Sequence, residues 1–306
     1  MTYLITGATG LIGQRLVAFL LNSGHAVNYL SARRSTSLDT RASFHRWDRG
    51  QPPDFGGMPR LDAVVHLAGE PIAQRWSHAV KRRIRDSRII GTRQLVSALG
   101  VLKHKPEVLV SASAVGYYGN RGDEVLDENS APGSDFLAEL CKDWEHEALQ
   151  AENFGIRTVM IRTGIVLSSR GGALARMLPV FGWGLGGRLG DGSQWMPWIH
   201  LDDLVRLLLY SAENNSIRGP VNGCAPQPVQ NSEFTKALAL ATHRPALFPV
   251  PGFVLRAVLG ELGGFLLASE RAVPKRAEAA GFQFTHPSLP EALQSLMEAP
   301  RASAQH

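Results

Sequence analysis

The stretch that decides the fold is Thr2-Tyr3-Leu4-Ile5-Thr6-Gly7-Ala8-Thr9-Gly10-Leu11-Ile12-Gly13, at the very start of the chain. An apolar, strand-like run leads directly into a glycine-rich turn, and Leu11–Asn22 then has the apolar spacing of a helix. Glycines here permit a tight turn, close approach of a phosphate group and close helix-to-strand packing, and the free N–H groups of the helix start favour an anion. The stretch therefore predicts a dinucleotide site formed by Gly7, Thr9, Gly10, Leu11, Ile12 and Gly13.

Further strand-like runs follow, separated by segments with helical periodicity. The predicted strands are Tyr3–Thr6, Ala26–Ser31, Ser43–Trp47, Ala63–Leu67, Glu107–Ser111 and Arg157–Arg162, and Trp76–Leu99 is predicted to be a second helix. Regular alternation of strands and helices is typical of a parallel sheet covered on both faces. The expected fold class is therefore α/β, a doubly wound parallel-sheet Rossmann fold with a smaller, mainly helical C-terminal substrate lobe.

The pattern changes after Thr163, which suggests the domain organisation. We expect a Rossmann domain over 1–168 that also takes in about 197–225, a Gly-rich lid or substrate loop without regular structure over 169–196, a helical lobe over 226–300 and a loose tail over 301–306. Asp202 is placed to cap a helix over 203–213. The apolar stretch Val250–Ala268 is broken by charges and glycines, which favours a buried helix over a membrane span.

Composition and charge limit the classes of function. The 306 residues carry a formal charge of +5, yet the basic residues are scattered except for a cluster within one predicted helix. That cluster consists of Lys81, Arg82, Arg83, Arg85 and Arg88, and without stacking aromatic residues it favours a solvated helix face over a nucleic-acid site. We expect a small-molecule substrate, no nucleic acid, no membrane and no metal, in a monomer or homodimer.

The two cysteines point to a reducing compartment. Cys141 and Cys224 are far apart and form no Cys-x-x-Cys pair, so neither a disulfide framework nor a thiolate metal site is indicated. The N-terminus enters a strand at once, without a basic segment or an apolar signal region ahead of it. These features predict a cytoplasmic protein.

The end of the second predicted strand selects the cofactor. An acidic residue there would accept the ribose hydroxyls of NAD, but the chain reads Ser31-Ala32-Arg33-Arg34. Guanidinium groups bind phosphate oxygens in a bidentate manner, so Arg33 and Arg34 favour NADP, with its 2′-phosphate, over NAD. Asp39 is too far into the loop to bind the ribose, and Asp48 is expected beside the adenine.

Several further motifs occur in an order that resembles a known superfamily. They include His66–Ile72, Ser111–Gly119, Arg162–Gly164, Trp198–Asp203 and Arg271–Arg276. Together with Gly7–Gly13 they resemble the extended short-chain dehydrogenase/reductase superfamily, and within it the atypical "epimerase family" proteins of the NAD-dependent epimerase/dehydratase group, which have a C-terminal domain of unknown function of the DUF1731 type. The resemblance implies that Leu67, Ala68, Gly69 and Arg162 lie along the cofactor, and that Ser113 hydrogen-bonds the reacting oxygen.

The sequence departs from the superfamily at its catalytic pair. The Tyr-x-x-x-Lys motif should lie on the helix around Asp135–Glu147, yet Phe136 and Leu140 occupy what look like the Tyr and Lys positions. Lys142 is out of helical phase with that site. A substitute for the missing tyrosine must therefore come from elsewhere, and Tyr117 is the first choice, with Tyr118 the second, because both follow Ser113 on the same strand-to-loop segment.

Other polar and aromatic residues have open roles. Glu70 and Arg88 could supply an acid and an anion contact to the substrate, although a structural role fits each equally well. Trp183, Trp195 and Trp198 could form either a flat substrate wall or the apolar core of the lid. Arg271 and Arg276 could face an anionic substrate or lie on exposed helix positions, and His200 is more typical of a framework histidine than of a base.

Two functions remain at this point. The first is an NADP-dependent oxidoreductase or epimerase, acting on an unknown small polar substrate with a non-standard proton-transfer group. The alternative is a non-catalytic NADP-binding redox sensor or scaffold, which the loss of the Tyr/Lys pair would explain. The first is preferred because a protein without the usual acid–base pair can still turn over slowly.

Overall fold

The computed structural model describes residues 1–48 and 50–302 of the chain. Its centre is a seven-stranded sheet in the order β11-β7-β5-β4-β1-β2-β3, in which every pairing is parallel. The strands are β1 (Thr2–Thr6), β2 (Ala26–Ser31), β3 (Ser43–Arg46), β4 (Ala63–His66), β5 (Val108–Ala114), β7 (Arg157–Thr163) and β11 (Gly219–Gly223). The predicted doubly wound α/β fold is confirmed.

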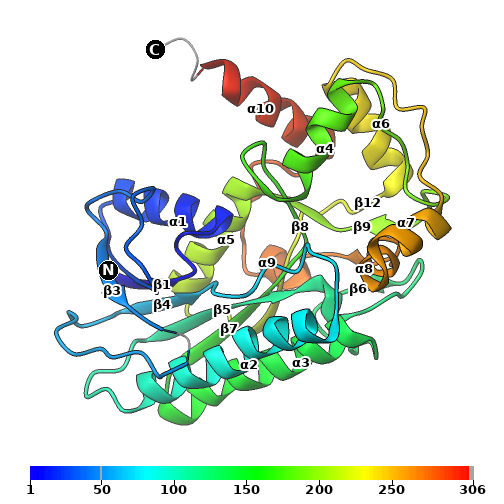
Figure 1. Cartoon of the computed structure of the whole chain (residues 1–306). Coiled ribbons are helices and arrows are strands. Elements are labelled where there is room, and N and C mark those ends of the chain that lie inside the picture. Colours follow the sequence, from blue (N-terminus) through cyan, green and yellow to red (C-terminus); the bar gives the residue numbers. More distant parts are fainter. Residues whose placement is uncertain (49, 303–306) are drawn as a thin grey trace.

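Helices cover both faces of this sheet (Figure 1). One face carries α1 (Leu11–Asn22) and α5 (Leu201–Glu213), and the other carries α2 (His78–Gly100) and α3 (Phe136–Leu149). Two short 3-10 helices, η1 (Val115–Tyr117) and η2 (Gln150–Phe154), follow β5 and α3. The carboxyl ends of β1, β4, β5 and β7 consequently meet along one edge, where ligands of open α/β folds bind.

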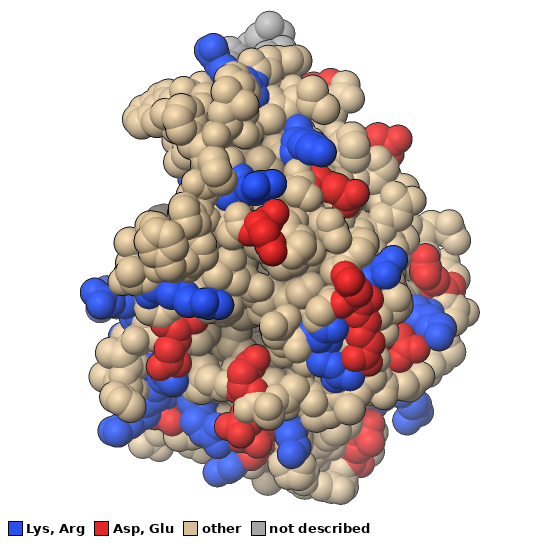
Figure 2. All heavy atoms as spheres, turned by 90° about the vertical axis from the view of Figure 1, so that its right-hand side faces the viewer, with Lys and Arg blue, Asp and Glu red and all other residues tan. Residues whose placement is uncertain are grey.

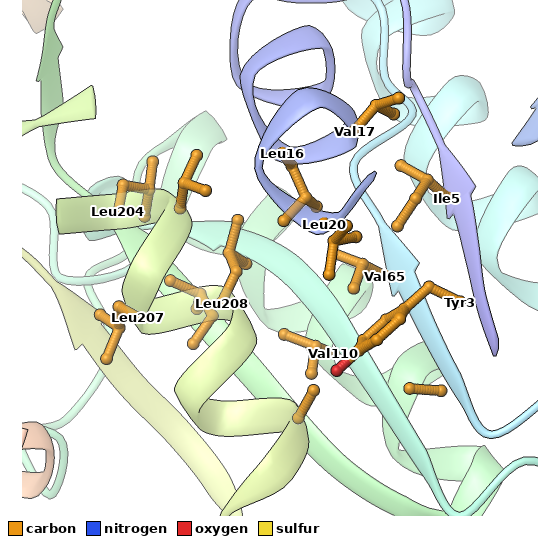
Figure 3. Close-up of a cluster of buried hydrophobic side chains, with 14 of the residues drawn as sticks. Tyr3, Ile5, Leu16, Val17, Leu20, Val65, Val110, Leu204, Leu207 and Leu208 are labelled. Atoms are coloured by element: carbon orange, nitrogen blue, oxygen red, sulfur yellow. The ribbon is translucent and has the colours of Figure 1, made fainter. Parts of the chain in front are cut away.

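The larger core lies between the sheet and the first helix pair. Leu16 and Leu20 of α1 and Leu204 and Leu208 of α5 interdigitate with sheet residues such as Val110, as Figure 3 shows. The spacing of four residues on each helix places these leucines on one stripe, which explains why the sequence folds as helix here. The periodicity of Leu11–Asn22 therefore predicted the helix with its observed bounds.

Three two-stranded sheets lie outside the central sheet. They pair β6 (Val125–Leu126) with β13 (Arg271–Ala272), β8 (Ile165–Leu167) with β10 (Trp198–His200), and β9 (Trp195–Met196) with β12 (Val229–Gln230). The first and the third of these sheets join the C-terminal region to the main body. The region is otherwise helical and contains α4 (Gly172–Gly182), α6 (Asn231–Ala241), α7 (Gly252–Leu259), α8 (Glu261–Phe265), α9 (Lys275–Ala279) and α10 (Leu289–Ala302). A second core unites α4, α6 and α10, whereas Ala277 of α9 packs back onto the core of the main sheet.

Four local expectations need correction. The Gly-rich segment is not irregular throughout, because the burial of Leu174 and Phe181 holds an eleven-residue helix, α4, inside it. Asp202 does not cap α5: His200 accepts the Asp202 N–H, and the Asp202 carboxylate pairs with Arg15 on α1 at 2.6 Å.

The other two corrections concern the C-terminal region. The stretch Val250–Ala268 forms two short helices rather than one buried helix, and Phe253 on the first is 73% exposed. In the predicted tail, residues 301 and 302 belong to α10, and the rest of it lies outside the described residues.

Candidate active site

The glycine-rich turn connects β1 to α1 and leaves no room for side chains. Gly7 has φ +71°, and a Cβ on it would lie 2.6 Å from the carbonyl carbon of Leu67. A Cβ on Gly13 would lie 2.2 Å from the Gly7 carbonyl oxygen. The turn is thus packed directly against the loop that follows β4, as the roles assigned to these two glycines require.

The start of α1 is open to an anion. Its N-cap is Gly10, no side chain caps the helix, and no acidic residue lies in the first turn. Thr9 and Gly10 are exposed, and Leu11 and Ile12 are half-buried. By contrast, Ser77 and Asp135 cap α2 and α3 with their side chains. The uncapped α1 N–H groups and the helix dipole therefore suit a pyrophosphate.

The end of β2 carries positive charge. Arg33 and Arg34 are both exposed. Asp39, further into the loop, is held by Arg41, whose side-chain hydrogen bonds lower the pKa of that carboxyl to about 2. Asp48 is exposed and forms an ion pair with Arg46 at 2.9 Å. The described residues at the end of β2 thus offer two guanidinium groups and no carboxylate.

A buried histidine fixes the loop after β4. His66 Nδ1 lies 2.6 Å from Thr6 Oγ1, its Nε2 lies 3.0 Å from Thr92 Oγ1, and Thr92 also accepts a hydrogen bond from Trp144 Nε1. Burial lowers the pKa of His66 to about 4, with Arg88 adding to the effect, so the ring is neutral at pH 7. Because Thr6 Oγ1 also accepts the Ala68 N–H, the network holds the predicted cofactor wall to β1.

Arg88 and Glu70 lie together beside that loop. Arg88 Nη1 donates to the Glu70 carbonyl at 2.9 Å, and a Cβ on Gly69 would lie 3.1 Å from the Arg88 Cζ. The Glu70 carboxylate is half-buried, 3.7 Å from Arg83. The two predicted substrate residues are therefore neighbours, and the Arg88 guanidinium packs against Gly69.

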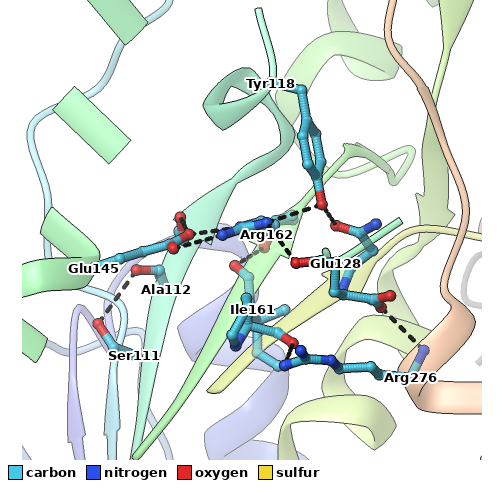
Figure 4. Close-up of polar contacts among 12 residues, drawn as sticks. Ser111, Ala112, Tyr118, Glu128, Glu145, Ile161, Arg162 and Arg276 are labelled. Atoms are coloured by element: carbon cyan, nitrogen blue, oxygen red, sulfur yellow. Dashed lines mark hydrogen bonds and ion pairs between the residues drawn. The ribbon is translucent and has the colours of Figure 1, made fainter. Parts of the chain in front are cut away.

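A buried polar network lies at the ends of β5 and β7 (Figure 4). Ser113 Oγ donates to Glu145 Oε1 at 2.7 Å, and Arg162 donates to both Glu145 oxygens at 2.8 Å. Arg162 also donates to the Tyr118 hydroxyl, which contacts Asn222 Oδ1 at 2.7 Å. Since a serine hydroxyl has one proton, Ser113 in this arrangement has none left for a reacting oxygen.

The two tyrosines of this segment differ in environment. Tyr118 is fully buried, and burial raises the pKa of its phenol well above the usual range. Tyr117 is half-buried, and its ring lies 3.5 Å from the Arg162 guanidinium carbon. Tyr118 and Arg162 are therefore internal parts of the network, whereas Tyr117 remains partly exposed.

The expected positions of the Tyr/Lys pair are apolar. Leu140 is buried in a cluster with Ile84 and Leu137, and Phe136 packs edge-on against Trp76 at 5.4 Å. Lys142 is exposed, in agreement with its helical phase. The first turns of α3 thus supply hydrophobic packing at the place where the superfamily has its acid–base pair.

The remaining aromatic and basic candidates differ in their surroundings. Trp198 is fully buried in the core that includes α4 and α6, so we do not retain it as a substrate contact. Trp183 is 79% exposed. Trp195 packs against the Arg271 guanidinium at 4.2 Å, and Arg276 donates to the carbonyls of Arg218 and Pro220. The hydrogen bonds of Arg276 hold the framework, and Arg271 is half-buried against Trp195.

Glu145 accepts hydrogen bonds from both Ser113 and Arg162, although its sequence context predicts no role for it. Its only sequence signal is its place beside Trp144, since nothing local shows that it will be buried.

Across the described residues, no group of three or more His, Cys, Asp and Glu side chains is arranged to hold a metal ion. Among the described helices, none has the length and apolar character needed to cross a bilayer.

These features define a class: a Rossmann-fold protein of the short-chain dehydrogenase/reductase type, with a dinucleotide turn at the start of α1. Comparison with known proteins then gives the family. The model described as "NAD dependent epimerase/dehydratase family" matches residues 3–222, and one described as "Domain of unknown function (DUF1731)" matches residues 250–296. The chain belongs to the NAD-dependent epimerase/dehydratase family, and the predicted resemblance is confirmed.

Three of the similar proteins carry family names rather than reactions. "Epimerase family protein SDR39U1 homolog, chloroplastic" of Arabidopsis thaliana is 41% identical, covering 97% of this chain and 87% of that protein. "Epimerase family protein MT2273" of Mycobacterium tuberculosis is 44% identical over 94% of this chain and 95% of its own length. The crystal structure of human epimerase family protein SDR39U1 with NADPH has a TM-score of 0.87 and 33% identity, covering 97% of this chain and 99% of that one.

Proposed function

We propose that this chain is an NADP(H)-dependent oxidoreductase or epimerase that acts on a small polar substrate. The observation that carries the proposal is an open glycine turn at α1 followed, at the end of β2, by Arg33 and Arg34. A 2′-phosphate matches two guanidinium groups, whereas NAD would leave them without a partner. The NADPH in the human relative's crystal structure supports this cofactor.

The chain's own residues would bind and orient the cofactor. The α1 N–H groups from Gly10 onward would bind the pyrophosphate, Arg33 and Arg34 the 2′-phosphate, and Leu67–Gly69 would form a wall of the site, with Asp48 near the adenine. A bound nicotinamide would supply or accept a hydride.

The substrate would lie above the ends of β4 and β5. Glu70 and Arg88 would contact its polar groups, and the half-buried Tyr117 phenol would hydrogen-bond its reacting oxygen. Ser113 could take part only by giving up its bond to Glu145. A group other than the Tyr/Lys pair would therefore have to carry the proton.

The second candidate, a non-catalytic NADP-binding sensor or scaffold, is favoured by one observation. Phe136 and Leu140 are held in an apolar cluster, so no rearrangement of α3 would bring an acid–base pair to the site. We place this candidate second because Glu70, Arg88 and Tyr117 remain as polar groups of the proposed substrate site.

A single-turnover experiment separates the two. NADPH-loaded protein is mixed with diacetyl, methylglyoxal or menadione, and the loss of NADPH fluorescence is followed. An enzyme consumes its cofactor with at least one of these carbonyl compounds. Bound NADPH that is inert toward all three, together with a partner protein recovered only in its presence, would establish the sensor.

We also propose an oligomeric state and a cellular compartment for the protein. The oligomeric state, monomer or homodimer, can be measured by light scattering. Cys141 and Cys224 are both buried and free, which fits the expected reducing cytoplasm.

A further inference from the structure

Glu270 is a buried acid without a hydrogen-bond partner. It lies between α8 and β13 and is 6% exposed, and its Oε1 is enclosed with no hydrogen-bond partner among the described residues. Buried polar groups are nearly always hydrogen-bonded, and an exception is costly enough to need a reason. Ser211 Oγ is the other such atom among the described side chains.

The other buried glutamates show what a structural role looks like in this chain. Glu128 accepts the N–H groups of Asn222 and Arg276, and Glu145 accepts from Ser113 and Arg162. Glu147 holds the guanidinium of Arg93. Of the four glutamates that the structure describes as buried, Glu270 alone has a completely enclosed oxygen left unpaired.

The backbone around Glu270 is firmly held. Its N–H donates to the Trp195 carbonyl at 3.2 Å. The hydroxyl of the preceding Ser269 accepts the Trp195 N–H and donates to the Gly122 carbonyl, and the Ser269 N–H donates to Asn120 Oδ1. The C-terminal region thereby fixes Glu270 against the loop that follows β5, so the carboxyl is directed by the fold and is not a mobile surface group.

The chain directly after Glu270 packs onto the segment that follows Ser113. Arg271 stacks on Trp195, and Ala272 is buried in the cluster of Val115 and Tyr118 against which Tyr117 packs. Glu270 therefore lies two residues from a buried contact with that segment.

Two groups on α3 interact electrostatically with Glu270. Burial raises the pKa of Glu270 to about 8, and the charge of Asp135, the N-cap of α3, contributes to this increase. The pKa of Cys141, one turn beyond Phe136, is raised to about 12, chiefly by burial, and Glu270 is among the contributing charges. The Cys141 thiol also contacts the backbone of Ala114 at the end of β5. The Glu270 carboxyl is thus close enough to α3 to interact electrostatically with Asp135 and Cys141.

We propose that Glu270 is the substrate-contacting acid of this site, which supplies from the C-terminal region the proton that α3 lacks. The inference rests on the proposed function. The ligand it would take has a carbonyl or hydroxyl oxygen as hydrogen-bond acceptor. In reduction of a carbonyl, the O–H bond of Glu270 breaks and an O–H bond forms on the substrate oxygen, while the carbonyl carbon gains the hydride. The remaining carboxylate regains a proton from water.

The test compares E270Q with E261Q. The amide of E270Q keeps the shape of the carboxyl group and a hydrogen-bond donor, but it cannot give up a proton. The control position, Glu261, is an exposed glutamate on α8 that pairs with Lys81. With NADPH and the three carbonyl probes, E270Q should lose about 10²–10⁴-fold in single-turnover rate with unchanged NADPH affinity. E261Q should match the wild type.

The pH dependence gives a second readout. The wild-type rate should fall as the pH rises through about 8, and the rate of E270Q should not show this step. The neighbouring Cys141 remains a thiol over this range, and Asp135 is present in both proteins, so neither group accounts for the difference. Carbon-13 NMR of labelled glutamate carboxyls should show one titration near that pH, absent from E270Q. An E270D variant, which keeps the acid, should retain more activity than E270Q.

The outcomes are distinguishable. If the wild type binds NADPH but the cofactor is inert toward every probe, the proposed function is contradicted. The assignment of Glu270 as its acid then fails as well. Turnover undiminished in E270Q, or no glutamate carboxyl that titrates near pH 8, contradicts the assignment of Glu270 alone.

Discussion

Ser113 donates its hydroxyl proton to Oε1 of Glu145 at 2.7 Å, inside the protein rather than toward a ligand. The same carboxylate receives both arms of Arg162. The serine that the superfamily uses at the reacting oxygen is therefore engaged in a buried ion-pair network, and the site depends on other groups for its chemistry.

This network makes a stability prediction. Glu145→Ala leaves the Arg162 guanidinium, 3% exposed, without its counter-charge, which should lower the free energy of unfolding by about 3–5 kcal/mol. Urea denaturation measures it. Glu139→Ala on the exposed side of α3 is the matched control and should change little. A loss below about 1 kcal/mol in E145A would mean that the network does not hold α3 to β7.

The turn makes a prediction about binding. Gly13→Ala would put a Cβ 2.2 Å from the Gly7 oxygen, so the backbone of the turn must move and NADPH affinity should fall at least about tenfold. Gly91→Ala on α2 meets no atom within 4 Å and serves as the control. Equal NADPH affinity for both variants, measured by fluorescence titration, would show that the turn does not bind the cofactor.

The two neighbouring tyrosines should respond differently to loss of the hydroxyl. Tyr117→Phe removes a half-buried phenol, so turnover should fall while NADPH affinity and the unfolding midpoint stay the same. Tyr118→Phe removes the hydroxyl that accepts from Arg162 and donates to Asn222 Oδ1, and it should instead lower stability by about 1–3 kcal/mol. Unchanged turnover of Y117F in the carbonyl assay would remove Tyr117 from the site.

His66 gives the protein a defined acid sensitivity. Its pKa is about 4 in the folded state against an ordinary 6.5, so the unfolded state binds the proton first as the pH falls. Stability should accordingly drop between pH 6.5 and 4, with about 2 kcal/mol lost at pH 5 through this group.

Urea midpoints at pH 7 and pH 5 measure this drop. His66→Gln removes the part due to His66 and leaves that of His200, whose pKa is also about 4. An equal pH dependence in H66Q and the wild type would show that the folded state accommodates the charged ring.

The parts of the site that are local in sequence could be predicted. The glycines of the turn, the arginines after β2 and the wrong residues at the Tyr and Lys positions are all visible as short patterns, because turn geometry and helical phase act over a few residues. The helix α1 was predicted with its observed bounds for the same reason.

The parts set by packing could not be predicted. Glu145 and Arg162 lie on α3 and β7, and no local pattern shows that the two charges will be buried together. Glu270 comes close to α3 only because β13 pairs with β6, a contact between segments about half the chain apart. The helix α4 was missed because its glycines and Pro179 obscured two buried apolar residues.

The central claim is that the turn and the two arginines bind NADP(H), and one measurement tests it most directly. Fluorescence titration gives the Kd of NADPH and of NADH for the wild type and for a variant with Arg33→Ala and Arg34→Ala. We predict tighter NADPH binding by the wild type and a loss of at least about tenfold in the variant, with NADH affinity unchanged. Equal affinities of the wild type for the two cofactors, or no binding of either, would contradict the account.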